Sequence, residues 1–266
     1  MDRRGVNRRR IIPRAPFDLD DALYGIHTVA EALAAGERLR ELHVAEDRRR
    51  DPAVRDLLAR AAEENVEVAF EPREFFTRIP FRAHQGVVAV AEPFAYSTLD
   101  QVLAQRKRDE PALFVVLDHL TDPHNVGAIL RTAECAGANA MILPDRRSAS
   151  INATVRKAAA GAAARVPVAQ VGNLAVAVRT LKKDGIWVVG ADAEAPTDMT
   201  EGDLNRDLAI VVGAEGDGLS QLVRRECDYL LRIPMKGKLG SLNASVATGI
   251  LLFETLRQRR PAIRAT

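Results

Sequence analysis

Cysteines, aromatic residues and long apolar runs are scarce in this chain of 266 residues. The two cysteines, Cys135 and Cys227, form no CxxC pair and have no histidines at metal-ligand spacing, which argues against a disulfide framework or a metal site. We expect both to be buried, reduced thiols. No apolar run approaches the roughly 20 residues that cross a membrane, and the charged N-terminus lacks the apolar stretch of a secretory signal. These absences predict a cytoplasmic protein without a metal or a membrane partner.

The chain also has almost equal numbers of basic and acidic residues. The formal net charge is +2, so the overall charge identifies no partner. The arginines are nevertheless concentrated in residues 1–14, MDRRGVNRRRIIPR. Such an arm is typically disordered and often contacts nucleic-acid phosphates, and a solvated tail is the plain alternative. We predict an arm over residues 1–19 in which Arg8, Arg9 and Arg10 contact nucleic acid.

Residues 20–93 alternate between short strands and amphipathic helices, which predicts a small α/β unit. Thr28 stands where it could cap a helix ending at Gly36, with Glu31 completing a capping box. From residue 94 to residue 111 the pattern gives way to a highly charged stretch with one short helix, which we interpret as a linker. The other elements that we predict here are strands over 39–44, 66–70 and 85–90 and a helix over 51–64.

Residues 112–266 alternate steadily between strands and helices. The run at 113–117 is continuously apolar, as in a strand that is covered on both faces. We therefore predict an α/β fold with a parallel sheet and helices on both faces. The predicted strands are 113–117, 140–143, 166–171, 186–190, 208–213 and 229–233, and the predicted helices are 125–136, 152–164, 174–183, 219–225 and 241–257.

Three strand-to-helix loops in this region, at 118–127, 213–220 and 233–243, are rich in glycine and polar residues. Ligands of parallel sheets bind at the carboxyl ends of the strands, where these loops lie. The second loop contains Gly-x-Gly but neither the spacing of a dinucleotide fingerprint nor a following Gly-Lys-Ser/Thr. No serine, histidine and acid stand in a nucleophile-elbow context. The pattern favours a ligand held by loop backbone and a helix N-terminus.

Several segments carry a family resemblance. NVGAILRTAECAG, IVVGAEGDGLS and IPMKGKLGSLNASVATGILLFE resemble, in order, the three motifs of the SpoU or TrmH class of SPOUT RNA 2′-O-methyltransferases. YGIHTVAEAL and HQGVVAV resemble the N-terminal substrate-binding domain found in that class, and SASINATVRKAAAGAAARVPV resembles the branch that methylates a guanosine ribose in 23S rRNA. The resemblance extends over nearly the whole chain.

The resemblance implies a C-terminal trefoil knot, S-adenosylmethionine as methyl donor, no metal, and a homodimer joined through the catalytic domains. It implies a ribosomal-protein-like RNA-binding domain at residues 20–93, which would dock structured RNA by shape and phosphates. The partner would be RNA, 23S rRNA or a ribosome precursor. The implied cofactor contacts are Gly213, Ile233 and Leu242, with Met235 and Gly237 nearby.

The implied reaction moves a methyl group from a sulfonium to a ribose 2′-hydroxyl, which requires close positioning and the handling of one proton. The resemblance makes Arg131 essential. Because the arginine pKa lies at about 12.5–13.8, we interpret Arg131 as a cationic clamp on a phosphate that also stabilises the developing alkoxide, not as a base. The alternative is a surface arginine paired with a carboxylate.

The other candidate residues have structural alternatives as well. Asn125 is a catalytic-site residue by resemblance and an N-cap by the commonest use of asparagine. Glu215 could orient Arg131 or a substrate hydroxyl, or be a surface acid. Ser241 and Asn243 open the last helix and could also contact the cofactor or the target nucleotide. Asn152 matches an RNA-binding position near the site, and His124 is disfavoured as a base.

Three functions follow from these observations. The first is ribose methylation of a guanosine in 23S rRNA. The second is the same chemistry on tRNA or at another rRNA site, as in antibiotic-resistance relatives. The third is an RNA-binding assembly factor without catalysis, which the retention of the candidate catalytic residues disfavours. Gly240 stands where relatives often carry a larger polar residue, so we expect a more mobile loop there.

Overall fold

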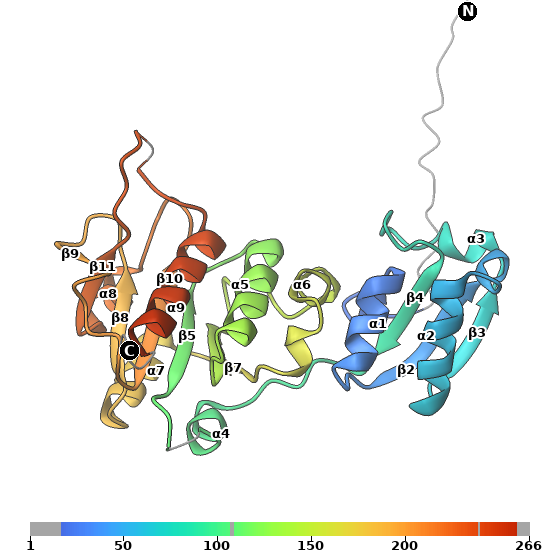
Figure 1. Ribbon diagram of the computed structural model, residues 1–266, viewed down its shortest axis with the longest axis horizontal. Helices are drawn as coiled ribbons and strands as arrows, with labels where there is room; N and C mark the ends of the chain where they lie inside the picture. The colour runs from blue at the N-terminus through green and yellow to red at the C-terminus, as the bar shows by residue number, and fades with distance from the viewer. Residues whose placement is uncertain (1–16, 107–108, 239, 260–266) are drawn as a thin grey trace, which may run out of the picture.

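The computed structural model describes residues 17–106, 109–238 and 240–259. The predicted contacts of Arg8, Arg9 and Arg10 lie outside these residues. Two sheets form two lobes, which Figure 1 shows side by side. We call β1 to β4 with α1 to α3 the small lobe, and β5 to β11 with α4 to α9 the large lobe. The sheets fall within the predicted ranges 20–93 and 112–266, and the division into independent domains stays a prediction.

The small lobe is built on a four-stranded sheet in the order β1-β4-β2-β3. β2 and β3 run parallel, and the other pairs are antiparallel. Asp51 caps the second helix by accepting the backbone N–H of Ala53 at 3.0 Å. The elements are β1 (Ala22–Tyr24), α1 (Ile26–Ala34), β2 (Leu39–Ala45), α2 (Pro52–Glu63), β3 (Glu67–Glu71), α3 (Arg73–Phe76) and β4 (Val87–Ala91).

The predicted capping box at Thr28 is wrong. The first helix begins at Ile26, its N-cap is Gly25, and no side chain caps it. Gly25 has a φ of +96°, which turns the chain directly from β1 into α1 and suits glycine. Thr28 is instead buried inside the helix.

The large lobe has seven strands in the order β7-β6-β5-β10-β8-β11-β9, and every described pair is parallel. The strands are β5 (Leu113–Asp118), β6 (Ala140–Pro144), β7 (Val168–Val171), β8 (Trp187–Ala191), β9 (Thr197–Asp198), β10 (Leu208–Gly213) and β11 (Tyr229–Arg232). The helices are α4 (Leu99–Ala104), α5 (Pro123–Cys135), α6 (Ala153–Ala159), α7 (Leu174–Lys183), α8 (Gln221–Glu226) and α9 (Ala244–Arg259).

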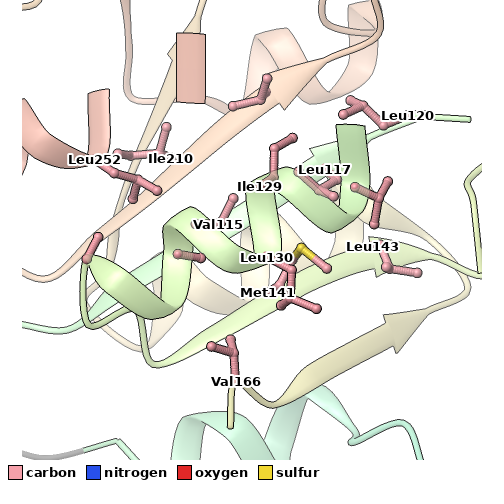
Figure 2. Close-up of a cluster of buried hydrophobic side chains, with 14 of the residues drawn as sticks. Val115, Leu117, Leu120, Ile129, Leu130, Met141, Leu143, Val166, Ile210 and Leu252 are labelled. Atoms are coloured by element: carbon pink, nitrogen blue, oxygen red, sulfur yellow. The ribbon is translucent and has the colours of Figure 1, made fainter. Parts of the chain in front are cut away.

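Two apolar layers cover the large sheet. One packs α5, α6 and α9 on one face, and the other packs α4, α7 and α8 on the opposite face. Alternation along β5 explains both layers, because Val115 and Leu117 face the first layer while Phe114 and Val116 face the second. Figure 2 shows the first layer, with α5 lying over the strands. The predicted parallel sheet with helices on both faces is confirmed.

The helix predicted over 152–164 is interrupted. α6 ends at Ala159, Ala160 and Gly161 have φ values of +49° and +80°, and a short 3-10 turn follows at Ala162–Ala164. A Cβ added to Gly161 would lie 3.1 Å from the carbonyl oxygen of Glu31 in α1. The break therefore occurs where the small lobe approaches closely.

α6 joins the two lobes. Its first residue, Ala153, packs in one apolar cluster with residues of the small lobe, including Ala22 and Tyr24. Arg156 is buried, forms an ion pair with Glu37 at 3.0 Å and donates a hydrogen bond to the carbonyl of Glu92 at 3.0 Å. These contacts fix the lobes relative to each other through a helix of the large lobe.

The two cysteines differ from each other. Cys135, at the end of α5, is exposed, which contradicts the expected burial, whereas Cys227 is partly buried. Both are free thiols. In the described part of the chain, no helix is long and apolar enough to span a membrane.

Candidate active site

The three predicted loops meet at the carboxyl edge of the large sheet. β5 and β10 are neighbours, and Asp118 pairs with Gly213 at the end of their ladder. The loops that follow these strands therefore start side by side, although 95 residues separate them in the sequence. α9 begins close by, because the backbone N–H of Ala244 donates to a carboxylate oxygen of Glu215 at 3.2 Å.

Glu215 is the centre of this arrangement. Its Oε1 atom accepts from Asn125 Nδ2 at 2.9 Å and from Asn243 Nδ2 at 2.6 Å, in addition to the Ala244 N–H. Asn243 Nδ2 also donates to Asn125 Oδ1 at 2.9 Å. One carboxylate thus ties together residues from all three loops, and hydrogen bonds to a charged acceptor are stronger than neutral ones.

Local sequence explains how the two asparagines reach Glu215. Asp122 caps α5 by accepting the N–H of His124 at 2.9 Å, and Pro123 takes the first helical position. Asn125 is therefore not the N-cap, and its side chain is available to Glu215.

The last helix begins at Ala244, three residues later than predicted. Asn243 caps it, with Oδ1 accepting the N–H groups of Ser245 at 3.0 Å and Val246 at 3.3 Å. Ser241 is exposed and precedes the helix.

A first cavity of about 540 Å³, which we call the strand-end cavity, opens beside Glu215 at the ends of β8, β10 and β11. Four of the five predicted cofactor contacts line it, and so do Ser241 and Gly240. Gly237 does not line it. The predicted residues that do are Gly213, Ile233, Met235 and Leu242.

Gly213 is required by the close return of the loop. The N–H of Gly218 donates to the carbonyl of Ala214 at 2.9 Å, so the loop folds back over the end of β10. A Cβ on Gly213 would lie 2.1 Å from the carbonyl oxygen of Gly218, where no side chain fits. The space that a side chain would take is filled by the returning loop, whose residues from Ala214 to Leu219 line the cavity together with Gly213.

A second cavity of about 550 Å³, which we call the loop cavity, lies against the first. Both are lined by Ala214, Glu215, Asp217 and Gly218. The remaining lining comes chiefly from the loops after β5 and β6, with His119, Asp122, Asn125, Arg147 and Ser220 among the polar residues. Glu215 therefore stands at the boundary of two adjoining spaces, an arrangement that can hold two reactants side by side.

A buried carboxylate and a histidine beside the loop cavity were not among the predicted site residues, and only the histidine, His119, lines the cavity. Asp118 is fully buried, and its Oδ2 accepts the N–H of Ser220 at 2.7 Å. Its Oδ1 pairs with Nδ1 of His119, whose φ is +61°. The available signal was an acid at the end of a continuously apolar strand, where buried charge requires partners.

Arg131 lies apart from this cluster. It is exposed on α5 and lines neither cavity. Among the described residues it makes no ion pair and no side-chain hydrogen bond, so within them it contacts neither Glu215 nor another carboxylate. The six-residue spacing from Asn125 explains this, because it turns the two side chains toward different sides of the helix.

Asn152, a predicted RNA-binding residue, and His124, which was disfavoured as a base, also lie elsewhere. Asn152 caps α6, with Oδ1 accepting from the backbone N–H groups of Thr154 and Val155 at 3.1 Å. His124 lines a third cavity, between the lobes. Within the described ranges no group of three or more histidine, cysteine or acidic residues could hold a metal ion.

Comparisons with known proteins identify the class. Residues 112–253 match the model of the SpoU rRNA Methylase family, and residues 22–97 match the model named RNA 2′-O ribose methyltransferase substrate binding. The fold and the two matched regions define an RNA methyltransferase. The chain belongs to the SpoU rRNA methylase family.

Similar proteins match over nearly their full length. The 23S rRNA (guanosine-2′-O-)-methyltransferase RlmB of Pseudomonas syringae is 44% identical over 90% of this chain and 96% of its own. YacO, a TrmH-family protein of Bacillus subtilis, is 40% identical over 91% of this chain and 97% of its own. The crystal structure of AviRb from Streptomyces viridochromogenes with AdoMet has a TM-score of 0.78 at 27% identity, covering 90% of this chain and 89% of AviRb.

Proposed function

We propose that this protein transfers a methyl group from S-adenosylmethionine to the 2′-hydroxyl of a guanosine ribose in 23S rRNA. The observation that carries the proposal is the three-loop junction at Glu215, placed between two adjoining cavities. The similarity to RlmB supports the guanosine and the 23S rRNA. The AdoMet complex of AviRb supports the methyl donor.

The strand-end cavity fits the methyl donor. Its volume of about 540 Å³ lies within the range of roughly 300–1,000 Å³ that is usual for small-ligand sites. Its walls combine apolar side chains such as Ile233 and Leu242 with the glycines of the loop after β10, which present backbone to the cavity. Asp192 and Glu194 add carboxylates that can accept hydrogen bonds from hydroxyl or ammonium groups.

The loop cavity suits the acceptor nucleotide. S-adenosylmethionine, when bound, supplies a methyl group on a positively charged sulfur. The chain must hold the ribose hydroxyl in line with that methyl group, where Glu215 divides the cavities. Glu215 Oε1 is occupied by three N–H groups, so we assign its second carboxylate oxygen to the 2′-hydroxyl. Asp217, nearby, can accept from the N–H donors that guanine carries and adenine lacks on the same edge.

The homodimer is part of the proposal. α9 carries an apolar stripe at Val246, Ile250 and Phe253, and Val246 and Phe253 are 50% and 52% exposed. This i, i+4, i+7 spacing puts them on one helix face. α9 packs against α5, which carries the exposed Arg131. Pairing of two copies along this stripe would bury apolar surface and bring Arg131 to the junction between subunits, where it can bind a phosphate of the substrate.

A charge-introducing variant tests the dimer. Phe253→Glu should give a monomer in sedimentation, because it places a carboxylate in the stripe that pairing of two copies would bury. Leu222→Glu is the matched control, since Leu222 is an exposed apolar residue on α8, outside the stripe. Dimers that persist in Phe253→Glu would contradict this interface.

The resemblance also implies that the segment after β11 is threaded into a trefoil knot. We include this knot in the proposal, and an experimental main-chain trace would test it.

The decisive experiment follows labelled methyl transfer from S-adenosylmethionine to 23S rRNA and to tRNA, with mapping of the modified nucleotide. Glu215→Ala should slow transfer by about 10- to 100-fold, as expected if about 1.4–2.8 kcal/mol of positioning is lost. Glu215→Gln should lose less, because its amide oxygen can still accept. Glu201→Gln is the control, since Glu201 is an exposed acid that lines neither cavity.

The result also separates the alternatives. Transfer to tRNA, or to a different rRNA position, would favour the second function. Binding of RNA without any transfer would favour an assembly factor. Removing residues 1–14, which lie outside the described residues, should weaken RNA binding mainly at low salt.

A further inference from the structure

A third cavity, of about 490 Å³, lies between the lobes, and we call it the interlobe cleft. The small lobe contributes Tyr24, Phe81 and Arg82, and the large lobe contributes His124, Thr154 and Lys157. The described lining contains basic side chains and no acidic one. Such a space favours an anionic ligand.

The cleft also presents an aromatic surface. The rings of Tyr24 and Phe81 stack in parallel, with centroids 4.1 Å apart and an interplanar angle of 5°. Tyr24 is buried and Phe81 is partly exposed, so Phe81 forms the accessible end of the stack. Nucleic-acid bases stack on exposed aromatic rings regardless of their sequence, and basic side chains beside the ring hold the backbone.

Lys157 is poised for an anion. Its Nζ lies 3.8 Å from the centre of the Tyr24 ring, and it forms no ion pair with any described residue. Burial lowers the pKa of the Lys157 ammonium. A phosphate in the cleft would supply the counter-charge that the ammonium lacks, and Arg82, which is exposed at the same cleft, would add a second positive charge.

The position of the cleft links it to the site. His124 and Asn125 are consecutive residues in the first turn of α5. His124 lines the interlobe cleft, whereas Asn125 binds Glu215 and lines the loop cavity. Arg156, the residue before Lys157 in α6, joins the two lobes outside the cleft through its ion pair with Glu37 and its hydrogen bond to the carbonyl of Glu92. An RNA strand that occupied both the interlobe cleft and the loop cavity would cross only the first turn of α5 between them.

We propose that the interlobe cleft binds an unpaired RNA nucleotide next to the one that is methylated, with its base stacked on Phe81 and its phosphate held by Arg82 and Lys157. This inference rests on the proposed function and deepens it, because it requires the substrate to be unpaired beside the target.

Equilibrium binding of the full-length protein to a 23S rRNA fragment tests the proposal without depending on catalysis. Phe81→Ala should weaken binding by about tenfold, as expected for one lost base stack. Phe81→Trp should bind the RNA fragment as tightly as the wild type, because tryptophan keeps the stacking surface. A merely structural role for Phe81 would not predict this result. Arg82→Gln and Lys157→Gln should each lower the slope of log affinity against log salt by about 0.7, the value for one contact to a single strand.

Arg225→Gln is the matched control, because Arg225 is an exposed arginine of α8, on the opposite face of the large sheet. In turnover assays the cleft variants should raise KM for RNA and leave kcat and the affinity for S-adenosylmethionine unchanged. Photocrosslinking from a 4-thiouridine placed beside the target should label the peptide that contains Phe81. Affinities and salt slopes equal to those of Arg225→Gln would overturn the inference. A wild-type protein that binds the fragment but transfers no methyl group would instead overturn the proposed function.

Discussion

Adding one methyl group at Gly213 tests how closely the loop after β10 must return to its own strand. The new Cβ would lie 2.1 Å from the carbonyl oxygen of Gly218, 2.2 Å from its carbonyl carbon and 2.5 Å from the nitrogen of Leu219. All three are backbone atoms, so no side-chain rotation relieves the contact. The loop must move by about 1 Å to restore ordinary separations.

The cost of this movement can be worked out from two parts. Overpacking of a tightly packed position costs about 1–3 kcal/mol, which lowers the melting temperature of a chain of this size by about 2–10 °C. The same movement displaces Glu215, two residues along, from the two asparagines that it binds. A misplacement of about 1 Å at a reacting centre can cost about 100-fold in rate, and we expect a loss of that size in Gly213→Ala.

Thermal unfolding, calorimetric titration with S-adenosylmethionine and initial rates of methyl transfer together measure these effects. Gly172→Ala is the control, because the nearest heavy atom to its added Cβ is a carboxylate oxygen of Asp145 at 4.0 Å. The control should behave as the wild type in all three assays. If Gly213→Ala kept wild-type affinity and rate, the packing argument for the strand-end cavity would be refuted.

Three more predictions rest on burial and charge. Asp118→Asn should lower the free energy of unfolding in urea by about 1–3 kcal/mol, because a fully buried acceptor of two N–H donors is altered; an unchanged midpoint would contradict this. Burial, and then neighbouring carboxylates, raise the pKa of the Cys227 thiol from 9.0 to about 12, so iodoacetamide at pH 8 should label only the exposed Cys135 until urea is added. The raised pKa favours the folded state fully below pH 9, and this contribution should be lost as the pH rises toward 12. Arg131→Ala should abolish methyl transfer without changing the melting temperature, because the Arg131 side chain is exposed and forms no ion pair or side-chain hydrogen bond with the described residues. Near wild-type turnover would exclude its proposed role.

Periodicity in the sequence was sufficient for most elements of the fold. Continuous apolar runs located β5 and β10, and their placement inside a parallel sheet followed from the alternation of strands and helices. β1 and β9 were missed because strands of three and two residues carry no measurable period. The break in α6 was missed because it depends on the approach of α1, a segment more than a hundred residues earlier.

The site was predictable as a set of loops but not as a set of contacts. The motifs located Asn125, Glu215 and Asn243, and the structure brings these three together. Arg131 and a substrate hydroxyl are the partners that the sequence suggests for Glu215, but its partners in the structure are the two asparagines, 90 and 28 residues away. Which residues come together at such separations depends on the order of the strands in the sheet. The periodicity of the sequence does not indicate that order. The pairing of Asp118 with Ser220 escaped prediction for the same reason.

The insertion of β10 between β5 and β8 has a consequence for the order in which the molecule matures during synthesis. The small sheet is complete once Ala91 has been made, whereas one edge of β5 stays without a partner until β10 emerges 95 residues after it. An open edge of a long apolar strand is a template for association with other chains. We therefore expect the nascent chain to depend on protection of that edge, and the small lobe to form well before Ala244 closes the site.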